Sequence, residues 1–369
     1  MSAKTAVYLL PAAGRAGARD HTASTRHDLA QRLAALLGHE FRGEYDPTAP
    51  LPGGPCYFIP ADTLCAAEAE ALGIHGEHDL FGGVVPHPFL TTKTISHPAI
   101  GPDARVPEGW SHALWQHMGD AVLPGFSAFT PADVREAGRR LLGRGPVRLK
   151  LANGIGGSGQ STAADTAELD AAIAALDPGD VHRHGVVVEL NLDAPVTYSI
   201  GCVTVGDWQI AYHGTQQTTV DHRGNEVYGG SDLDMVRGGF DALLRLDLTA
   251  AQRLAVEYAM RYDAAVTRAY PGFFASRRNY DVASGTDRTG GDQCGVLEQS
   301  WRIGGASPAE IAALDAFNRD PALHRVRVQC CERYADQPPP TGATVHYRGD
   351  DGQAGMLCKY SLVTERHAA

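Results

Sequence analysis

One short stretch of the chain, residues 295–305, strongly limits what the surrounding sequence can form. An apolar pair leads into Glu298, and Ser300 and Arg302 follow at steps of two residues, before two glycines. On a β-strand, side chains two residues apart project from the same face, so the acid, the hydroxyl and the guanidinium would share one space. Carboxylate and hydroxyl oxygens can bind Mg²⁺, and arginine can neutralise a phosphate or a carboxylate. The alternative is a strand end at which Glu298 and Arg302 pair with each other in solvent.

Size, charge and cysteine usage narrow the class of protein. The 369 residues exceed one typical core, which predicts two or three subdomains. A formal net charge of −11 argues against a nucleic-acid-binding surface as the main role. The seven cysteines are an odd number without a C-x-x-C pair, so neither a disulfide framework nor a zinc site is predicted.

The same features predict where the protein works. Free thiols are typical of a reducing compartment. The apolar run at residues 6–11 is too short for a membrane-spanning helix and lacks a good cleavage pattern, so it is interpreted as a buried strand. We therefore expect a cytoplasmic protein.

The order of predicted elements indicates an α/β protein at the start of the chain. Strands are predicted at residues 5–11 and 57–60, and helices at 26–37 and 62–72. In the middle of the chain, a hydroxyl N-cap followed by proline predicts the start of a helix. A hairpin with a glycine-rich tip and an apolar central strand are predicted after this helix. These elements cover residues 130–142, 147–163 and 185–190.

The second half of the chain predicts mostly antiparallel strands. We expect a hairpin at 196–213, a long helix at 249–270 and two paired strands within 273–300. A further helix is expected at 307–317, and a strand-rich tail at 326–363. Residues 228–239 are interpreted as a long polar loop. Arg237 in it is a candidate to bind a substrate carboxylate, and an acidic surface excursion is the alternative.

Four separated pieces of sequence require one explanation. Lys150 ends a strand just before the glycine-rich loop, Glu189 ends an apolar strand about 40 residues later, and Asp281 and Glu298 lie on two successive strands. This order resembles the ATP-grasp superfamily, the fold of D-alanine–D-alanine ligase, glutathione synthetase and biotin carboxylase. The resemblance covers roughly residues 86–318, and in detail the chain looks like a bacterial family of unknown function within that superfamily.

The resemblance implies an α/β (α+β) fold of the ATP-grasp type. Its parts would be an N-terminal α/β domain, a lid subdomain with the glycine-rich hairpin, an antiparallel subdomain carrying the metal site, and a C-terminal β extension. The boundaries expected for these four parts are residues 1–90, 91–190, 191–320 and 321–369.

The resemblance also implies how ATP would be bound. Lys93 and Lys150 stand where two lysines contact the α- and β-phosphates. The glycine-rich loop, with Gly156, Gly157 and Ser158, would close over the triphosphate through its backbone N–H groups. The strand ending in Glu189 would recognise adenine through the backbone that follows it, Leu190 to Leu192. Val196 stands where the family often has an acid for the ribose.

The remaining site residues would act at the metal and the transferred phosphoryl group. Asp281 and Glu298 match two carboxylates that hold Mg²⁺ between the β- and γ-phosphates, and Ser300 stands where the superfamily usually has asparagine. Arg302 would face the phosphoryl group or a substrate carboxylate. Arg278 would stabilise the transition state, with Arg277 as the near alternative.

We therefore expect an ATP- and Mg²⁺-dependent ligase that joins a carboxylate to an amine through an acyl phosphate. The alternatives are a kinase-type phosphotransferase and a non-catalytic ATP-binding module. The expected partners are small-molecule carboxylate and amine substrates, without nucleic acid or membrane, and a homodimer is left open.

Overall fold

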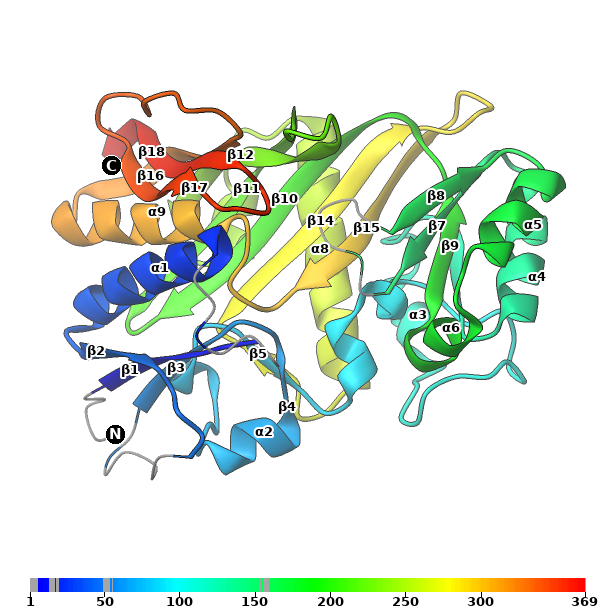
Figure 1. The fold of residues 1–369 in the computed structure, drawn as a ribbon, viewed down its shortest axis with the longest axis horizontal. Helices are drawn as coiled ribbons and strands as arrows, with labels where there is room; N and C mark the ends of the chain where they lie inside the picture. The colour runs from blue at the N-terminus through cyan, green and yellow to red at the C-terminus, as the bar shows by residue number, and fades with distance from the viewer. Residues whose placement is uncertain are drawn as a thin grey trace.

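The computed structural model describes residues 6–12, 17, 20–48, 54, 56–152, 154 and 159–368. These residues form four sheets with helices packed against them (Figure 1). The first sheet is parallel, with the strand order β2-β1-β3, and its strands are β1 (Ala6–Leu10), β2 (Glu40–Glu44) and β3 (Cys56–Pro60). The predicted first strand is thus confirmed as a buried strand.

Helix α1 (His21–Leu37) packs against this parallel sheet. It begins five residues before the predicted start, because the Asp20 carboxylate accepts hydrogen bonds from the N–H groups of Thr22 and Ala23, both at 2.9 Å. It ends as predicted at Gly38, whose φ of 69° suits a left-handed helix cap.

A set of short elements joins the N-terminal sheet to the rest of the molecule. Strand β13 (Phe274–Ala275) pairs with β5 (Gly83–Val85), so two segments about 190 residues apart in the sequence meet in one small sheet. The other short elements are β4 (Leu64–Cys65), α2 (Ala66–Ala71), η1 (Glu77–Asp79), η2 (Pro88–Thr91), η3 (Lys93–Ser96) and α3 (Leu114–Met118).

A four-stranded antiparallel sheet, called the lid sheet below, has the order β6-β9-β7-β8. Its strands are β6 (Gly125–Ala128), β7 (Val147–Leu151), β8 (Gln160–Ala163) and β9 (Val186–Leu190). Helices α4 (Pro131–Leu142), α5 (Thr166–Ala174) and α6 (Pro178–His184) contribute to its core. The predicted helix, hairpin strands and central strand of this region are confirmed.

An eight-stranded antiparallel sheet, called the large sheet below, has the order β15-β14-β10-β11-β12-β16-β18-β17. Helix α8 (Ala250–Ala269) covers one face, and α9 (Ser307–Arg319) together with α1 covers the other. The remaining elements are β10 (Asp193–Val205), β11 (Trp208–Val220), β12 (Glu226–Arg237), α7 (Phe240–Leu244), β14 (Arg277–Thr286), β15 (Asp292–Ser300), β16 (Leu323–Arg333), β17 (Thr344–Asp350) and β18 (Met356–Ala368).

The prediction of a polar loop at residues 228–239 is wrong, because most of this segment is strand β12. Leu233 and Met235 alternate into the core between the sheet and α9. Asp232 lies on the opposite face, where Arg327 on β16 neutralises it at 2.8 Å. The acidic residues of this segment pair with residues of a strand that is distant in the sequence. The segment therefore looks like a polar loop, although its apolar side chains recur at every second position, as in a strand.

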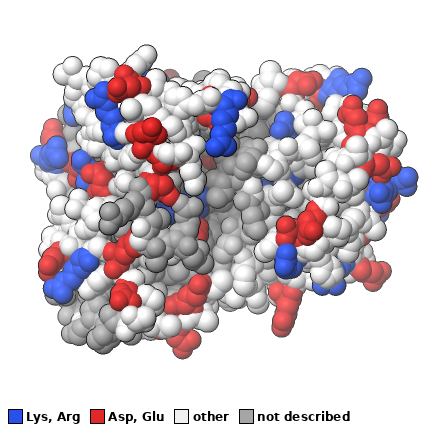
Figure 2. Space-filling model, in the orientation of Figure 1, with Lys and Arg blue, Asp and Glu red and all other residues white. Residues whose placement is uncertain are grey.

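None of the described helices is both long and apolar enough to cross a membrane. On the face shown in Figure 2, acidic and basic side chains are interspersed and do not gather into a basic patch.

Candidate active site

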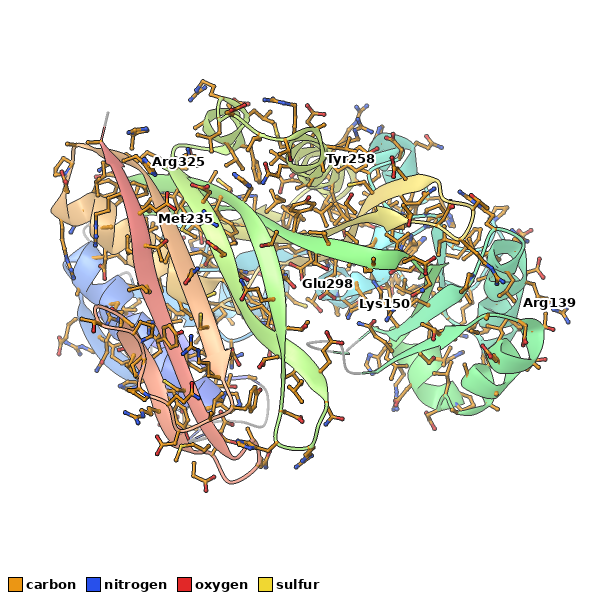
Figure 3. The ribbon with its side chains drawn as sticks, turned by 90° about the horizontal axis from the view of Figure 1, so that it is seen from above. Arg139, Lys150, Met235, Tyr258, Glu298 and Arg325 are labelled. Atoms are coloured by element: carbon orange, nitrogen blue, oxygen red, sulfur yellow. The ribbon has the colours of Figure 1, made fainter. Side chains whose placement is uncertain are left out.

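A large cavity of about 1040 Å³ separates the lid sheet from the large sheet. Lys150 reaches it from β7 of the lid, and Glu298 reaches it from β15 of the large sheet (Figure 3). The sequence alternation that aligned Glu298, Ser300 and Arg302 brings all three to this cavity, although β15 itself ends at Ser300. The candidate site is therefore built between two sheets that are distant in the sequence.

The lid wall carries a buried ion pair. Lys150 Nζ lies 2.5 Å from Glu189 Oε1, and His97 Nε2 lies 3.0 Å from Glu189 Oε2. Burial by itself would raise the pKa of Glu189, but the charge of Lys150 and the hydrogen bond from His97 outweigh it and lower this pKa to about 2. The ionised carboxylate thus holds the Lys150 ammonium at the cavity wall. His97 carries no local sequence signal and was not predicted.

The backbone after Glu189 forms one edge of the cavity. The Leu190 N–H donates to the Pro124 carbonyl at 2.9 Å. A hydrogen-bonded antiparallel pair normally exchanges two such bonds, but proline has no N–H to return one. The Leu190 carbonyl therefore receives no hydrogen bond from Pro124, and both Leu190 and Leu192 line the cavity.

The predicted glycine-rich loop is only partly visible. Gly156, Gly157 and Ser158 lie outside the described residues. Gly154, which precedes them, accepts a hydrogen bond from Lys93 Nζ at 2.7 Å. Lys93 is also 2.8 Å from Glu298 Oε2, so its ammonium links the lid loop to the large sheet.

The large sheet presents two adjacent carboxylates to the cavity. Asp281 on β14 and Glu298 on β15 are cross-strand partners. Gln216 Nε2 donates to Asp281 Oδ1 at 2.7 Å. Burial, followed by the charge of Glu298, raises the pKa of Asp281 to about 7. The hydrogen bond from Gln216 and the charges of Arg277 and Lys93 offset only part of this effect.

This donor set fits a hard divalent cation. Mg²⁺ prefers oxygen ligands and is often held by one or two carboxylates together with substrate phosphates. The described residues contain no group of three or more His, Cys, Asp or Glu side chains that could hold a metal. Asp281 and Glu298 would therefore need neutral oxygens, or oxygens of a bound nucleotide, to complete a Mg²⁺ site.

Three arginines near the acids have different surroundings. Arg302 lines the cavity, and burial and the nearby Arg277 lower its pKa. Arg277 is buried in an ion pair with Glu310 at 2.9 Å, and its Nη1 donates to Ser300 Oγ at 3.2 Å. Arg277 therefore positions the end of β15, and Arg302 is the guanidinium more open to a substrate.

The expectation that Arg278 stabilises the transition state does not match its placement. It precedes Asp281 by three residues, an odd number, so the strand turns its side chain to the opposite face. There it pairs with Asp263 at 3.1 Å and with Glu77 at 2.8 Å. These contacts tie β14 to α8 and η1, away from the cavity.

Arg237 is also placed away from the cavity. Its Nε donates to the Leu323 carbonyl at 2.6 Å and its Nη2 to the Phe317 carbonyl at 2.8 Å. The guanidinium stacks over Trp208, 4.7 Å from the ring centroid. Arg237 therefore closes the C-terminal end of α9, which corrects the interpretation of this residue as a substrate ligand.

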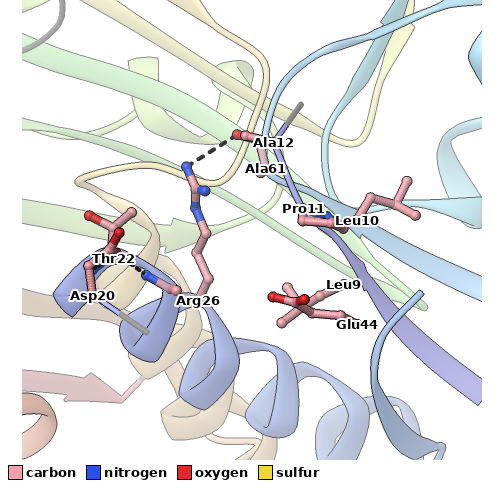
Figure 4. Close-up of a pocket in the computed structure, with 10 residues that line it drawn as sticks. Leu9, Leu10, Pro11, Ala12, Asp20, Thr22, Arg26, Glu44 and Ala61 are labelled. Atoms are coloured by element: carbon pink, nitrogen blue, oxygen red, sulfur yellow. Dashed lines mark hydrogen bonds between the residues drawn. The ribbon is translucent and has the colours of Figure 1, made fainter. Parts of the chain in front are cut away.

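The cavity continues to the C-terminal strands, which no sequence motif had linked to the site. Lys359 on β18 and Glu332 on β16 form an ion pair at 2.8 Å in this part of the wall. Helix α1 contributes Arg26, which also lines a small neighbouring pocket of about 30 Å³ at the end of β1 (Figure 4). Its Nη2 donates to the Ala61 carbonyl at 3.4 Å there.

The arrangement of a lid sheet, a large antiparallel sheet and a cavity with facing lysines and carboxylates defines an ATP-grasp fold. The chain belongs to the family described as protein of unknown function (DUF3182), whose model matches residues 9–361. No curated protein matches the chain.

The chain is similar to several solved structures at low sequence identity. N5-carboxyaminoimidazole ribonucleotide synthetase, solved as an ADP complex, is 10% identical over 98% of this chain and 93% of that chain, with a TM-score of 0.50. Phosphoribosylamine–glycine ligase from Thermotoga maritima is 14% identical over 98% and 90%, with a TM-score of 0.48. D-alanyl-alanine synthetase A from Vibrio cholerae is 14% identical over 84% and 91%, with a TM-score of 0.45.

Proposed function

We propose that this protein is an ATP- and Mg²⁺-dependent ligase that joins a small-molecule carboxylate to an amine. One observation carries the proposal. A single cavity holds a lysine buried against a carboxylate on the lid side, and two adjacent carboxylates on the opposite sheet. The likeness in fold to a synthetase solved with ADP supports a nucleotide in this cavity.

Each side of the cavity has a role in this proposal. Lys93 and Lys150 bind the phosphates of ATP, and the carbonyl of Leu190 accepts a hydrogen bond from the adenine amino group. Asp281 and Glu298 would hold Mg²⁺, which would supply neutralisation of phosphate charge. Lys93 Nζ lies 2.8 Å from Glu298 Oε2, so its ammonium stands beside the acid that would hold the metal and within the same cavity as the phosphates would be.

The proposed reaction has two transfers. A substrate carboxylate oxygen attacks the γ-phosphorus, the bond to the β-phosphate oxygen breaks, and ADP leaves. The amine nitrogen then attacks the acyl carbon, phosphate leaves, and the amine loses a proton to water. Arg302 neutralises charge on the carboxylate or the transferred phosphoryl group. Positioning and charge neutralisation supply the catalysis, so no protein nucleophile is required.

The decisive experiment measures release of ADP and phosphate, and the product formed, with pairs of candidate carboxylates and amines. Glu298→Ala should lower turnover at least about 100-fold, because a group that neutralises transition-state charge is lost. Glu136→Ala, which removes an exposed carboxylate on α4, is the matched control and should keep full activity.

The products separate the proposal from its alternatives. A condensed amide supports it, and a stable phosphorylated product would assign a kinase-type phosphotransferase instead. Tight ATP binding without turnover would assign a non-catalytic module. A folded protein that binds no Mg·ATP would overturn every ATP-dependent function.

A further inference from the structure

Four polar side chains form two neighbouring cross-strand pairs on β14 and β15 of the large sheet. Asp281 faces Glu298 across β14 and β15, and Asn279 faces Ser300 in the same register. Residues two apart on a strand share a face, so all four point to the side of the sheet that borders the cavity. All four line the cavity.

Ser300 is already engaged by a buried partner. Its Oγ receives a hydrogen bond from Arg277 Nη1 at 3.2 Å, and its carbonyl receives another from the same nitrogen at 3.0 Å. Arg277 is only 1% exposed and is held by Glu310. A hydroxyl that lies against a buried guanidinium is a poor place for a second cation, because the two positive charges repel.

Asn279 has the opposite arrangement. It is 7% exposed, and its Nδ2 donates to Ser199 Oγ at 2.7 Å. Its Oδ1 accepts no hydrogen bond from any residue in the described ranges, yet it is not among their fully enclosed polar atoms without a partner. The amide oxygen therefore opens onto the cavity with its acceptor capacity unused.

The neighbouring strands set the direction of this oxygen. Ser199 lies on β10, on one side of β14, whereas Glu298 and Ser300 lie on β15, on the other side. The oxygen and nitrogen of a carboxamide diverge from one carbon. With the nitrogen bonded on the β10 side, the oxygen lies on the other branch of the amide, away from Ser199.

We infer that Asn279 supplies the neutral oxygen that completes the cation site with Asp281 and Glu298. Ser300 then serves as a positioning residue that receives Arg277. Amide oxygens are ordinary ligands of hard divalent cations, and a neutral ligand adds no repulsion between carboxylates. The assignment rests on the proposed metal–nucleotide function, and it places the third protein ligand on β14 where Ser300 on β15 had been expected.

The test measures Mn²⁺ binding to the full chain in the presence of ADP, by electron paramagnetic resonance. Asn279→Ala should raise the Mn²⁺ dissociation constant at least tenfold, and Ser300→Ala should raise it less than threefold. Ser199→Ala removes the hydrogen bond that orients the amide but leaves its oxygen, so it should weaken Mn²⁺ binding by less than Asn279→Ala does. Asn279→Asp, which keeps an oxygen at that position, should retain Mn²⁺ even if Asn279→Ala loses stability.

The possible results are separable. Wild-type affinity in Asn279→Ala, or an equal loss in Ser300→Ala, would overturn the assignment and leave the proposed function standing. Failure of the wild-type protein to bind Mn²⁺ in the presence of ADP would overturn both.

Discussion

At the scale of single residues, the lid wall depends on one carboxylate that satisfies two partners. Glu189 is 2% exposed and contacts both Lys150 and His97. Breaking a buried ion pair leaves the other charge without a partner, which costs far more than losing a surface pair. Glu189 therefore serves stability as well as the placement of Lys150.

Glu189→Gln should lower the free energy of unfolding at pH 7 by about 3 kcal/mol, because the Lys150 ammonium stays buried without its counter-charge. Urea denaturation measures this loss. Glu136→Gln, at an exposed pair on α4, should change the same quantity by less than about 0.5 kcal/mol. Equal effects of the two substitutions would show that the Lys150–Glu189 pair is not the source of stability.

The same pair predicts a dependence on pH. The pKa of Glu189 is lowered from 4.5 to about 2 in the folded protein, so its stabilisation is present above pH 4.5 and is lost as the pH falls toward 2. The advantage of the wild type over Glu189→Gln should therefore shrink between pH 4.5 and pH 3. Urea denaturation of both proteins at several pH values in this window measures the difference, and a constant difference would contradict the assigned pKa.

At the scale of elements, strand β14 divides its residues between two tasks. Arg277, Asn279 and Asp281 lie on the cavity side, and Arg278 lies on the side of α8. A shift of one residue along the strand exchanges the two sets completely. The role that the family resemblance implied for Arg278 therefore does not match the face on which this residue lies.

Substitutions on the two faces of β14 should have different consequences. Arg278→Ala removes contacts to Asp263 and Glu77, so it should lower the melting temperature while Mn²⁺ binding in the presence of ADP stays within twofold of the wild type. Asp281→Asn should weaken Mn²⁺ binding at least tenfold and keep the melting temperature. Thermal unfolding and metal titration of both variants measure the contrast, and loss of Mn²⁺ binding in Arg278→Ala would contradict the division.

At the scale of the whole molecule, the cavity joins parts of the chain that no local pattern connects. The lid sheet, the large sheet, α1 and the C-terminal strands all contribute to its wall. Lys93 links the lid loop at Gly154 to Glu298. A nucleotide bound with its metal would connect the same parts and should stabilise the molecule as a unit.

ADP with Mg²⁺ should raise the melting temperature, and ADP with a chelator should raise it less. A ligand at 100 times its dissociation constant stabilises the native state by about 2.7 kcal/mol. Glu298→Ala should lose the Mg²⁺-dependent part of the rise, whereas Glu136→Ala should keep it. Differential scanning fluorimetry measures these shifts, and a rise that does not depend on Mg²⁺ would contradict the joint role of Asp281 and Glu298.

The sequence by itself determined the local features of this protein. A period of two places Glu298 and Ser300 on one face, and the N-cap at Thr130 and the glycine at Gly143 delimit α4. These features could be predicted because strand alternation and helix capping depend on residues a few positions apart.

Only the tertiary structure decided the partners of these residues. His97 and Glu189 meet across 92 positions, Arg277 and Glu310 across 33, and Asn279 faces Ser300 through the register of two strands. Strand β12 could not be predicted from the sequence for the same reason, since its acidic side chains are neutralised by arginines of the distant strand β16. Such contacts follow from how distant segments pack, and the cavity exists only where that packing brings the lid sheet and the large sheet together.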